Sequence, residues 1–232
     1  MENNRYQQSV DEQNNILARV HEFNDQQRSV LSKEGTLLRF ENGKHFNLPV
    51  NSTRPTLFWV IQGAVLLERN LADGKAMFSI LKESMAFPAS VGPKDEQGGV
   101  MVSYAVGPVT LLAIPFATFQ RLCQTDGNFA WTVISSLHQE NCLQSDLLKL
   151  SMAGAIPERI KNILIYFGHE CGQIQATGGV ALPRVLTYRV IAYFAKTTAQ
   201  TVAKTIKNLR TIGLLLPLNH KLVFSAAALD KL

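Results

Sequence analysis

The sequence has little cysteine, and none of it falls in an arrangement that stabilises small extracellular proteins. Only three cysteines occur among 232 residues, at the widely separated positions Cys123, Cys142 and Cys171. This odd number at this spacing fits neither a disulfide framework nor a CxxC metal-binding motif. We therefore expect the chain to work in a reducing compartment, and the cytoplasm is the predicted localisation.

Long apolar stretches are also missing. No run of about eighteen apolar residues occurs, so the sequence predicts no membrane-spanning helix and no membrane partner. The first residues, "MENNRYQQSVDEQNN", are polar and lack the apolar segment of a signal peptide. The sequence thus gives no reason to expect insertion or export.

Motifs for catalysis and metal binding are absent as well. The chain contains no G-x-S-x-G element, no phosphate-binding P-loop and no dinucleotide-binding fingerprint. Its histidines are scattered and match no spacing of metal ligands: His21, His45, His138, His169 and His220. We predict no catalytic residue, no metal site and no cofactor, and we do not expect an enzyme.

Acidic residues are scarce in the last third of the chain. Residues 150–232 contain ten Lys and Arg against three Asp and Glu, a net charge of +7. Residues 1–149 contain 13 Lys and Arg against 15 Asp and Glu, a net charge of −2. This asymmetry indicates that the last third meets a polyanion such as nucleic acid, with a solvated basic surface as the alternative.

The first half of the chain contains many short apolar or alternating runs. Between Thr36 and Pro115 these runs are "TLLRF", "TLFWVIQGAVLLERN", "KAMFSIL", "VMVSYAV" and "VTLLAI", and turn-forming residues separate them at "ENGK", "ADGK", "VGPKDEQGG" and "VGP". The pattern predicts an antiparallel sandwich, roll or barrel, with a hairpin at Asp73-Gly74. One or two short helices are expected within residues 5–34.

A segment without proline, Asp126 to Met152, predicts a helix about 37 Å long. Its apolar residues recur at three- and four-residue steps. This length is more typical of a dimer spine than of a core helix, although an ordinary core helix is the alternative. The predicted dimer seam consists of Phe129, Val133, Leu137, Leu143 and Leu147.

The stretch "LTYRVIAYFAKTTAQTVAKTIKNLRTIGLL", Leu186 to Leu215, predicts two short amphipathic helices joined by a tight turn. Thr187 can cap the first helix, and Thr197 or Thr198 the second. One face of the second helix is apolar, whereas another carries Gln200, Lys204, Lys207 and Asn208. Such a helix suits the major groove of DNA. Following it, "LLLPL" and "KLVF" predict a two-stranded wing that turns near Asn219 and His220.

Three parts of the sequence, in this order, resemble the bacterial cyclic-AMP receptor protein/fumarate-nitrate regulator (Crp/Fnr) family of transcription factors. The stretch from Leu57 to Leu81, with Gly63, resembles the family's β-roll, the helix at 126–152 its dimerising helix, and residues 186–215 its winged helix-turn-helix. The resemblance implies an α+β fold with a jelly-roll-like antiparallel β-roll (1–118), a long dimerisation helix (119–153) and a winged helix-turn-helix domain (154–232). It also implies three partners: a pseudo-palindromic double-stranded operator, a second copy of the chain, and RNA polymerase.

The sequence departs from the family's effector sites. Members that bind cyclic nucleotides carry an arginine that clamps the phosphate, but no arginine occurs between Arg69 and Arg121. Lys94 could supply charge without the two-pronged geometry of a guanidinium. Residues 1–122 contain no cysteine for an iron–sulfur cluster, and His45 is isolated. We therefore expect neither cyclic AMP dependence nor a bound haem or cluster.

The recognition helix departs from the family too. Many members place Arg, Glu and Arg where this chain has Ala199, Gln200 and Lys204, so a different operator is expected. In the turn between the two helices, this chain has Lys196 at a position where family members often have glycine. The predicted DNA-binding residues are Thr198, Ala199, Gln200, Thr201, Lys204, Lys207, Arg210, Lys196 and Lys221. The alternative function is a dimeric β-roll interaction protein that has lost specific DNA binding.

Overall fold

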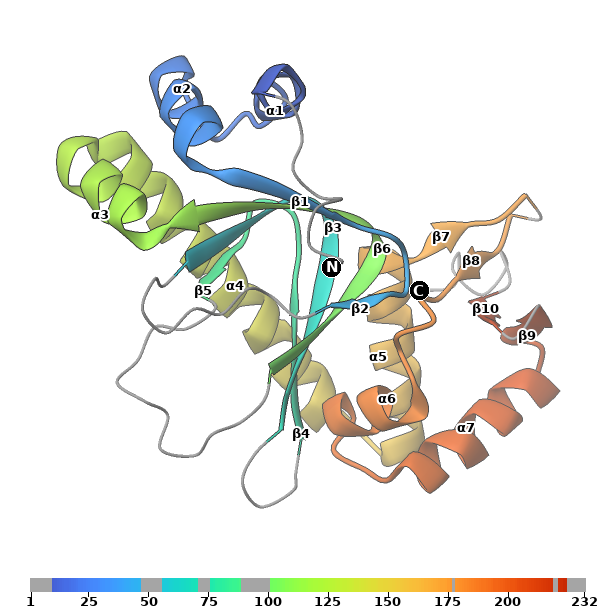
Figure 1. Ribbon diagram of the computed structural model, residues 1–232. Coiled ribbons are helices and arrows are strands. Elements are labelled where there is room, and N and C mark those ends of the chain that lie inside the picture. The colour runs from blue at the N-terminus through green and yellow to red at the C-terminus, as the bar shows by residue number, and fades with distance from the viewer. Residues whose placement is uncertain are drawn as a thin grey trace. The chain divides into compact units, whose positions relative to one another are not determined.

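The computed structural model describes residues 10–46, 56–70, 76–88, 101–176, 178–218 and 221–224. The chain forms two compact units, Met1–Cys142 and Leu143–Leu232, whose elements are labelled in Figure 1. The boundary between the units falls inside one long helix, α4 (Gly127–Met152). No described helix has the length and apolar character needed to cross a membrane.

The first unit is built on an antiparallel sheet. Its central strands run in the order β1-β6-β3-β4, while β2 pairs with β6 and β5 pairs with β3. Runs of alternating and apolar residues form these strands, as the sequence predicts. The strands are β1 (Thr36–Phe40), β2 (His45–Phe46), β3 (Thr56–Asn70), β4 (Ala76–Leu81), β5 (Ala86–Pro88) and β6 (Met101–Pro115).

The two longest strands, β3 and β6, pair along their whole length around an irregularity. The register shifts on both sides of Gln62, where residues 62 to 64 of β3 face residues 106 to 110 of β6. Gly63 has φ +80°, and a Cβ atom there would stand 2.3 Å from the carbonyl oxygen of Pro108. Only glycine therefore fits this close approach.

This irregularity corrects one expectation from the sequence. The prediction placed a turn at "VGP" and split residues 100–114 into two strands, whereas β6 is continuous from Met101 to Pro115. Gly107 does adopt a positive φ of +82°. It does so inside a bulge that pairs on both sides with β3, because Gly and Pro serve bulges as well as turns. The predicted hairpin turn at Asp73-Gly74 lies outside the described residues.

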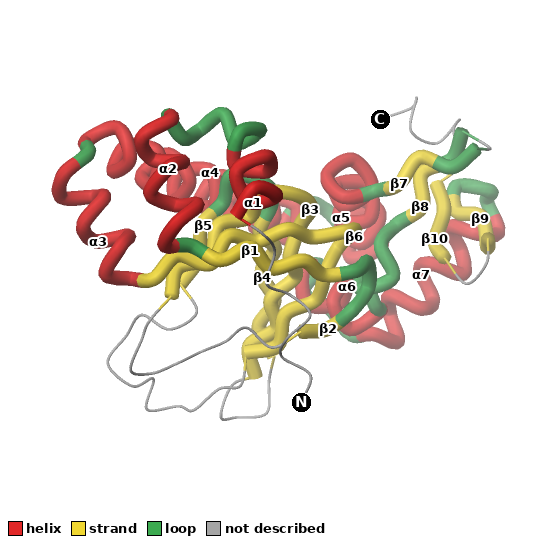
Figure 2. The backbone as a smooth tube through the Cα atoms, turned by 45° about the horizontal axis from the view of Figure 1, so that its top comes forward, coloured by secondary structure: helices red, strands yellow, loops and turns green. Residues whose placement is uncertain are grey.

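Helices cover one face of this sheet. They are α1 (Val10–Leu17), α2 (Asp25–Glu34), α3 (Phe116–Thr125) and the start of α4, and Figure 2 shows α1, α2 and α3 gathered at one end of the sheet. Phe23 packs against Trp59 and Phe129 at ring-centroid distances of 5.0 and 5.9 Å. These rings belong to a buried cluster that joins the helices to β1, β3 and β6.

Asp126 links α3 to α4. Its backbone N–H donates to Leu122 and closes α3, while its Oδ1 accepts from the N–H groups of Asn128 and Phe129 at 2.9 and 3.1 Å. The side-chain amide of Gln27 donates to the other carboxylate oxygen at 2.8 Å. The helix predicted from Asp126 to Met152 is thus present as α4, with an aspartate at its start.

The described part of the second unit combines the end of α4 and three further helices with a small sheet. Helices α5 (Ile156–Cys171), α6 (Tyr188–Phe194) and α7 (Ala199–Thr211) contact one another. The sheet has the order β7-β8-β10-β9, formed by Gln173–Ile174, Val180–Ala181, Lys221–Phe224 and Leu215–Leu218. The predicted wing is therefore present as β9 and β10, although its turn at Asn219 and His220 lies outside the described residues. This arrangement confirms the predicted α+β fold with its N-terminal β-roll and C-terminal winged helix-turn-helix.

Candidate nucleic-acid interface

Helix α6 and the turn after it set the position of α7. The hydroxyl of Thr187 accepts from the N–H of Val190 at 3.4 Å and caps α6. The helix ends at Phe194, and the turn to α7 contains Lys196 with φ +51°. A left-handed lysine costs about 1–2 kcal/mol, and its ammonium group lies 4.8 Å from the centroid of the Tyr193 ring. The turn thus has the left-handed residue expected at this point of a helix-turn-helix.

Helix α7 begins at a threonine cap. The hydroxyl of Thr198 accepts from the backbone N–H of Thr201 at 3.2 Å and lies 2.9 Å from the Thr201 hydroxyl. Of the two caps that the sequence allowed, Thr198 is the one used. This cap satisfies one of the free amides in the first turn and fixes where the helix begins.

One side of α7 is buried. Val202, Ile206 and Leu209 are buried at three- and four-residue spacing, and Thr205 lies beside them. The helix contacts α5, α6 and β9. This packing orients the helix about its own axis, so the opposite residues face solvent.

The exposed side of α7 is polar and basic. Gln200, Lys204, Lys207 and Arg210 are all exposed, and the helix contains no acidic residue. Neither lysine nor Arg210 forms an ion pair with a residue that the structure describes. By contrast, Lys149 and Lys161 in the same unit pair with Asp146 and Glu158 at 3.0 and 2.7 Å. The ammonium and guanidinium groups of α7 are thus available to an external anion.

The structure brings most of the predicted DNA-binding residues to one segment. Lys196, Thr198, Ala199, Gln200, Lys204, Lys207 and Arg210 are exposed in the turn and in α7, and Thr201 is half-buried beside the cap. Lys221 begins β10, but its side chain lies outside the described residues. Asn208 was not among the predicted site residues, yet it is exposed one turn after Lys204. The helical periodicity of the sequence does place it on the polar face with Gln200 and Lys204.

A second exposed surface lies on α4. The side chains of Trp131, Ile134, Leu148 and Met152 are 67, 54, 55 and 74% exposed. Of the five residues predicted for the dimer seam, Leu137 is exposed on this helix, whereas the chain buries the other four: Phe129, Val133, Leu143 and Leu147. The apolar periodicity in the sequence therefore identified mainly the side of α4 that packs into the protein. The apolar residues that face solvent form a different stripe on the same helix.

Comparison with known proteins places this arrangement. No protein-family model and no curated protein matches the sequence. Among solved structures, a CRP-family transcriptional regulator from Thermus thermophilus has a TM-score of 0.62 at 17% identity, covering 83% of this chain and 94% of that one. The c-di-GMP responsive regulator CLP from Xanthomonas campestris has a TM-score of 0.62 at 15% identity, covering 85% of this chain and 97% of that one.

A CooA variant from Carboxydothermus hydrogenoformans has a TM-score of 0.59 at 20% identity, covering 88% of each chain. These similarities extend over both units, and they agree with the β-roll and the winged helix-turn-helix described above. The resemblance inferred from the sequence is therefore confirmed at the level of structure: this chain has the fold of the CRP/FNR family of transcription regulators.

Proposed function

We propose that this protein is a sequence-specific, DNA-binding transcription regulator that acts as a homodimer. The observation that carries the proposal is the exposed face of α7, which is basic, free of acid and oriented by a capped, buried helix-turn-helix. Two solved proteins with this fold are named transcriptional regulators. A function on DNA would place the protein in the cytoplasm of a bacterial cell.

The proposed contacts divide by position along the interface. Gln200 and Lys204 lie in the first two turns of α7, where side chains of a recognition helix meet base edges. A glutamine amide can pair with adenine, and a lysine can donate to guanine. Lys207 and Arg210 lie farther along, and Lys196 lies in the turn, so we assign these three and Lys221 to the phosphate backbone.

Smaller side chains at the start of α7 complete the proposed interface. Ala199 can contact only an apolar group such as a thymine methyl. Thr198 and Thr201 hold the start of the helix through their shared hydroxyl contact, and their remaining hydrogen-bonding capacity can serve a phosphate. The expected operator thus differs from one read by arginine and glutamate.

The proposed dimer contact is the exposed apolar stripe of α4. Ile134 and Leu148 are separated by two heptads, and Trp131 and Met152 by three, which is the spacing of residues on one coiled-coil seam. Exposed apolar side chains repeated along one helix face are typical of a protein–protein contact. Across a two-fold axis, the stripe on one copy would pack against the same stripe on the second copy. Leu137 lies at the border of this stripe.

The effector is proposed to be something other than cyclic AMP. The segment from Ala86 to Val106 lacks the arginine that would clamp a cyclic phosphate, and much of that segment, Lys94 included, lies outside the described residues. The expected result of a calorimetric titration is no heat of binding from cyclic AMP at micromolar concentrations. Micromolar binding of cyclic AMP would contradict this part of the proposal.

The experiment that tests the DNA-binding function is selection of duplexes from a random pool, followed by crosslinking of the protein to the genome. We expect a two-fold symmetric site with half-sites about one helical turn apart. We also expect affinity that falls with added salt, because Lys and Arg release counterions from the phosphates. Failure to enrich any sequence would instead favour an interaction protein that has lost specific DNA binding. Contact with RNA polymerase is a separate expectation, tested by transcription in vitro.

A further inference from the structure

A pocket of about 370 Å³ lies in the first unit, between the segment that joins α1 to α2 and the sheet. Its walls come from that segment, from β1, β3 and β6, and from the turn between β4 and β5. This volume is in the range of pockets that hold small organic molecules. Every wall belongs to one unit, so the site does not depend on how the two units are placed.

The floor of the pocket contains a row of polar side chains across three strands. Arg39 of β1 lies opposite Thr110 of β6, which in turn lies opposite Gln62 of β3. Residues directly opposite one another in a sheet project their side chains from the same face. The register shift between Val60 and Gln62 is what turns Gln62 to this face, as bulges often do at binding sites.

The next row along the same face is apolar. Leu37, Leu112 and Trp59 lie opposite one another on the same three strands, and all three are buried. Trp59 also lines the pocket, and its indole Nε1 has no hydrogen-bond partner among the described residues. The pocket therefore forms at the border where the helix-covered part of the sheet becomes polar.

The carboxylates of Glu83 and Glu22 are held in place by hydrogen bonds near the turn between β4 and β5. The backbone N–H of Gly63 donates to Glu83 at 2.9 Å, and the hydroxyl of Ser84 donates to the carboxylate of Glu22. Ser84 has φ +66°, and its N–H donates to the carbonyl of Val60 at 2.9 Å. The turn between β4 and β5 is thus tied to β3, which keeps Glu83 at the rim of the pocket.

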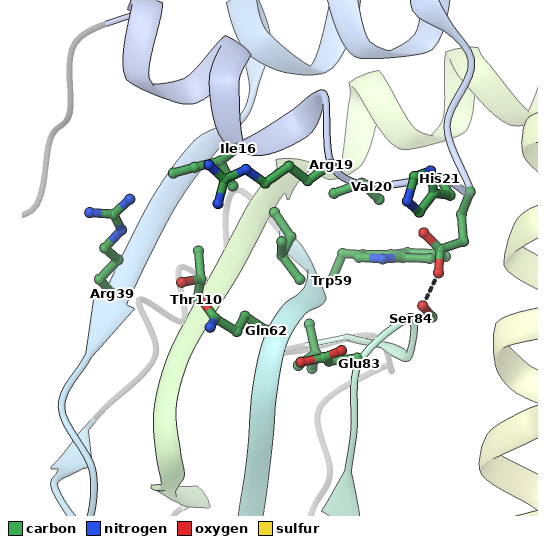
Figure 3. Close-up of a pocket in the computed structure, with 13 residues that line it drawn as sticks. Ile16, Arg19, Val20, His21, Arg39, Trp59, Gln62, Glu83, Ser84 and Thr110 are labelled. Atoms are coloured by element: carbon green, nitrogen blue, oxygen red, sulfur yellow. Dashed lines mark hydrogen bonds between the residues drawn. The ribbon is translucent and has the colours of Figure 1, made fainter.

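Opposite charges consequently gather at two sides of one pocket. Figure 3 shows the guanidinium groups of Arg19 and Arg39 at one side, and Glu83 and Ser84 beside Trp59 at the other. A guanidinium binds a carboxylate through two parallel hydrogen bonds. An ammonium group is attracted both by carboxylates and by the face of a tryptophan. The apolar part of the lining comes from Ile16, Val20, Ile61 and the Trp59 ring.

From this arrangement we propose that the pocket binds an α-amino acid with an apolar side chain. The carboxylate of the ligand lies against Arg19, its ammonium group lies against Glu83, Glu22 and the Trp59 ring, and its side chain packs on the apolar lining. This inference does not depend on the proposed DNA-binding function, because all of its residues lie in the first unit.

The test compares leucine with its two matched fragments. Isocaproate keeps the carboxylate without the amine, and isoamylamine keeps the amine without the carboxylate. The chain has two tryptophans, so in the full-length Trp131→Phe protein all tryptophan emission comes from Trp59 in the pocket. We expect saturable binding of leucine in roughly the micromolar to low millimolar range, seen by emission and by calorimetry of the unaltered protein.

Charge-removing variants locate the binding. Arg19→Gln and Glu83→Gln should each weaken leucine binding at least roughly tenfold, whereas Arg184→Gln, an exposed arginine of the second unit, should leave it unchanged. Each of the two fragments should bind at least roughly tenfold more weakly than leucine. The proposal is overturned if no apolar amino acid binds saturably, if isocaproate binds as tightly as leucine, or if Arg19→Gln binds leucine as the unaltered protein does. The comparison of ligands needs no variant, so a misfolded variant would not prevent the test.

Discussion

Helices α4 and α7 each bury one side and expose another, but the two exposed sides have opposite chemistry. On α4 the exposed side chains include Trp131, Ile134 and Met152. On α7 they include Gln200, Lys204 and Lys207. Both helices have an apolar face that packs into the protein, so that feature alone does not distinguish them.

The difference indicates which kind of partner each helix is suited to bind. An apolar stripe gains free energy by leaving water, which a second protein surface allows and DNA does not. Ammonium groups without acidic neighbours are stabilised by binding phosphates, whereas burying them in an apolar contact costs free energy. The exposed side of α4 therefore suits self-association, and that of α7 suits nucleic acid. Each substitution below changes either the exposed side of one of these helices or the residue that caps it.

The largest effect is expected from placing a charge in the stripe of α4. The substitution Ile134→Asp would bring two carboxylates together at the proposed dimer contact, where neither could be solvated fully. We expect self-association to weaken about 100-fold or more, equivalent to roughly 3 kcal/mol. Sedimentation equilibrium over a concentration series measures this directly, and binding to a two-fold symmetric duplex should fall with it.

The matched control is Gln139→Asp, an exposed residue on another face of the same helix. It adds the same charge outside the stripe and should leave the dimer intact. If the unaltered protein is monomeric at micromolar concentration, or if both substitutions have equal effects, the stripe is not the dimer contact. Leu137→Asp should act in the same direction as Ile134→Asp but less strongly, because Leu137 lies at the border of the stripe.

The sequence predicted the helices and strands well where local signals are strong. The runs that became β1 and β3, the helix from Asp126 to Met152, and the caps at Thr187 and Thr198 all follow from periodicity and capping chemistry. The continuous strand β6 did not follow, because Gly107 and Pro108 have the same local preferences in a bulge as in a turn. Only pairing with a distant strand distinguishes the two.

The candidate site was predicted unevenly for a similar reason. The exposed face of α7 could be derived, since one short helix with a single apolar stripe leaves no ambiguity about its polar side. On α4 apolar residues lie on two sides. Periodicity cannot say which side the chain itself covers, so the predicted seam combined Leu137 with residues that are buried within the single chain. The pocket beside Trp59 was not predicted at all, because it depends on cross-strand register.

A smaller effect is expected from removing the cap of α7. The substitution Thr198→Ala removes the hydroxyl that accepts from the N–H of Thr201. It should lower the free energy of unfolding of the second unit by about 1 kcal/mol, seen in denaturant unfolding followed by circular dichroism. Thr211→Ala, at the other end of α7, removes a hydroxyl that donates to the carbonyl of Lys207 and caps no first-turn amide, so it should lower the free energy of unfolding less. Equal losses would show that the Thr198 cap contributes nothing particular.

The smallest effect concerns the start of α4, where the cap is charged. Hydrogen bonds from the Gln27 side chain and from the backbone of Phe129 and Asn128 hold the pKa of Asp126 below its ordinary value. A carboxylate with a lowered pKa stabilises the fold above the pKa of the unfolded chain, and this contribution is lost as the pH falls below about 4. Asp126→Asn should therefore lower the Tm at neutral pH, and by less than Thr198→Ala does.

The difference in Tm between the unaltered protein and Asp126→Asn should shrink as the pH falls towards 3. The threonine cap of α7 carries no charge, so the effect of Thr198→Ala should not change in this way. Melting both variants across a pH series separates the two caps. A constant Tm difference for Asp126→Asn would mean that the charge of Asp126 does not stabilise the start of α4.

The most direct test of the central claim is a fluorescence titration of selected and scrambled duplexes with Gln200→Ala and Lys207→Ala across a salt series. Gln200→Ala should cost about 1–3 kcal/mol on the selected duplex and little on the scrambled one, because it removes a base contact. Lys207→Ala should weaken both alike and reduce the salt slope by about one, because it removes a phosphate contact. If both variants bind both duplexes as the unaltered protein does, α7 does not enter the major groove and the account is contradicted.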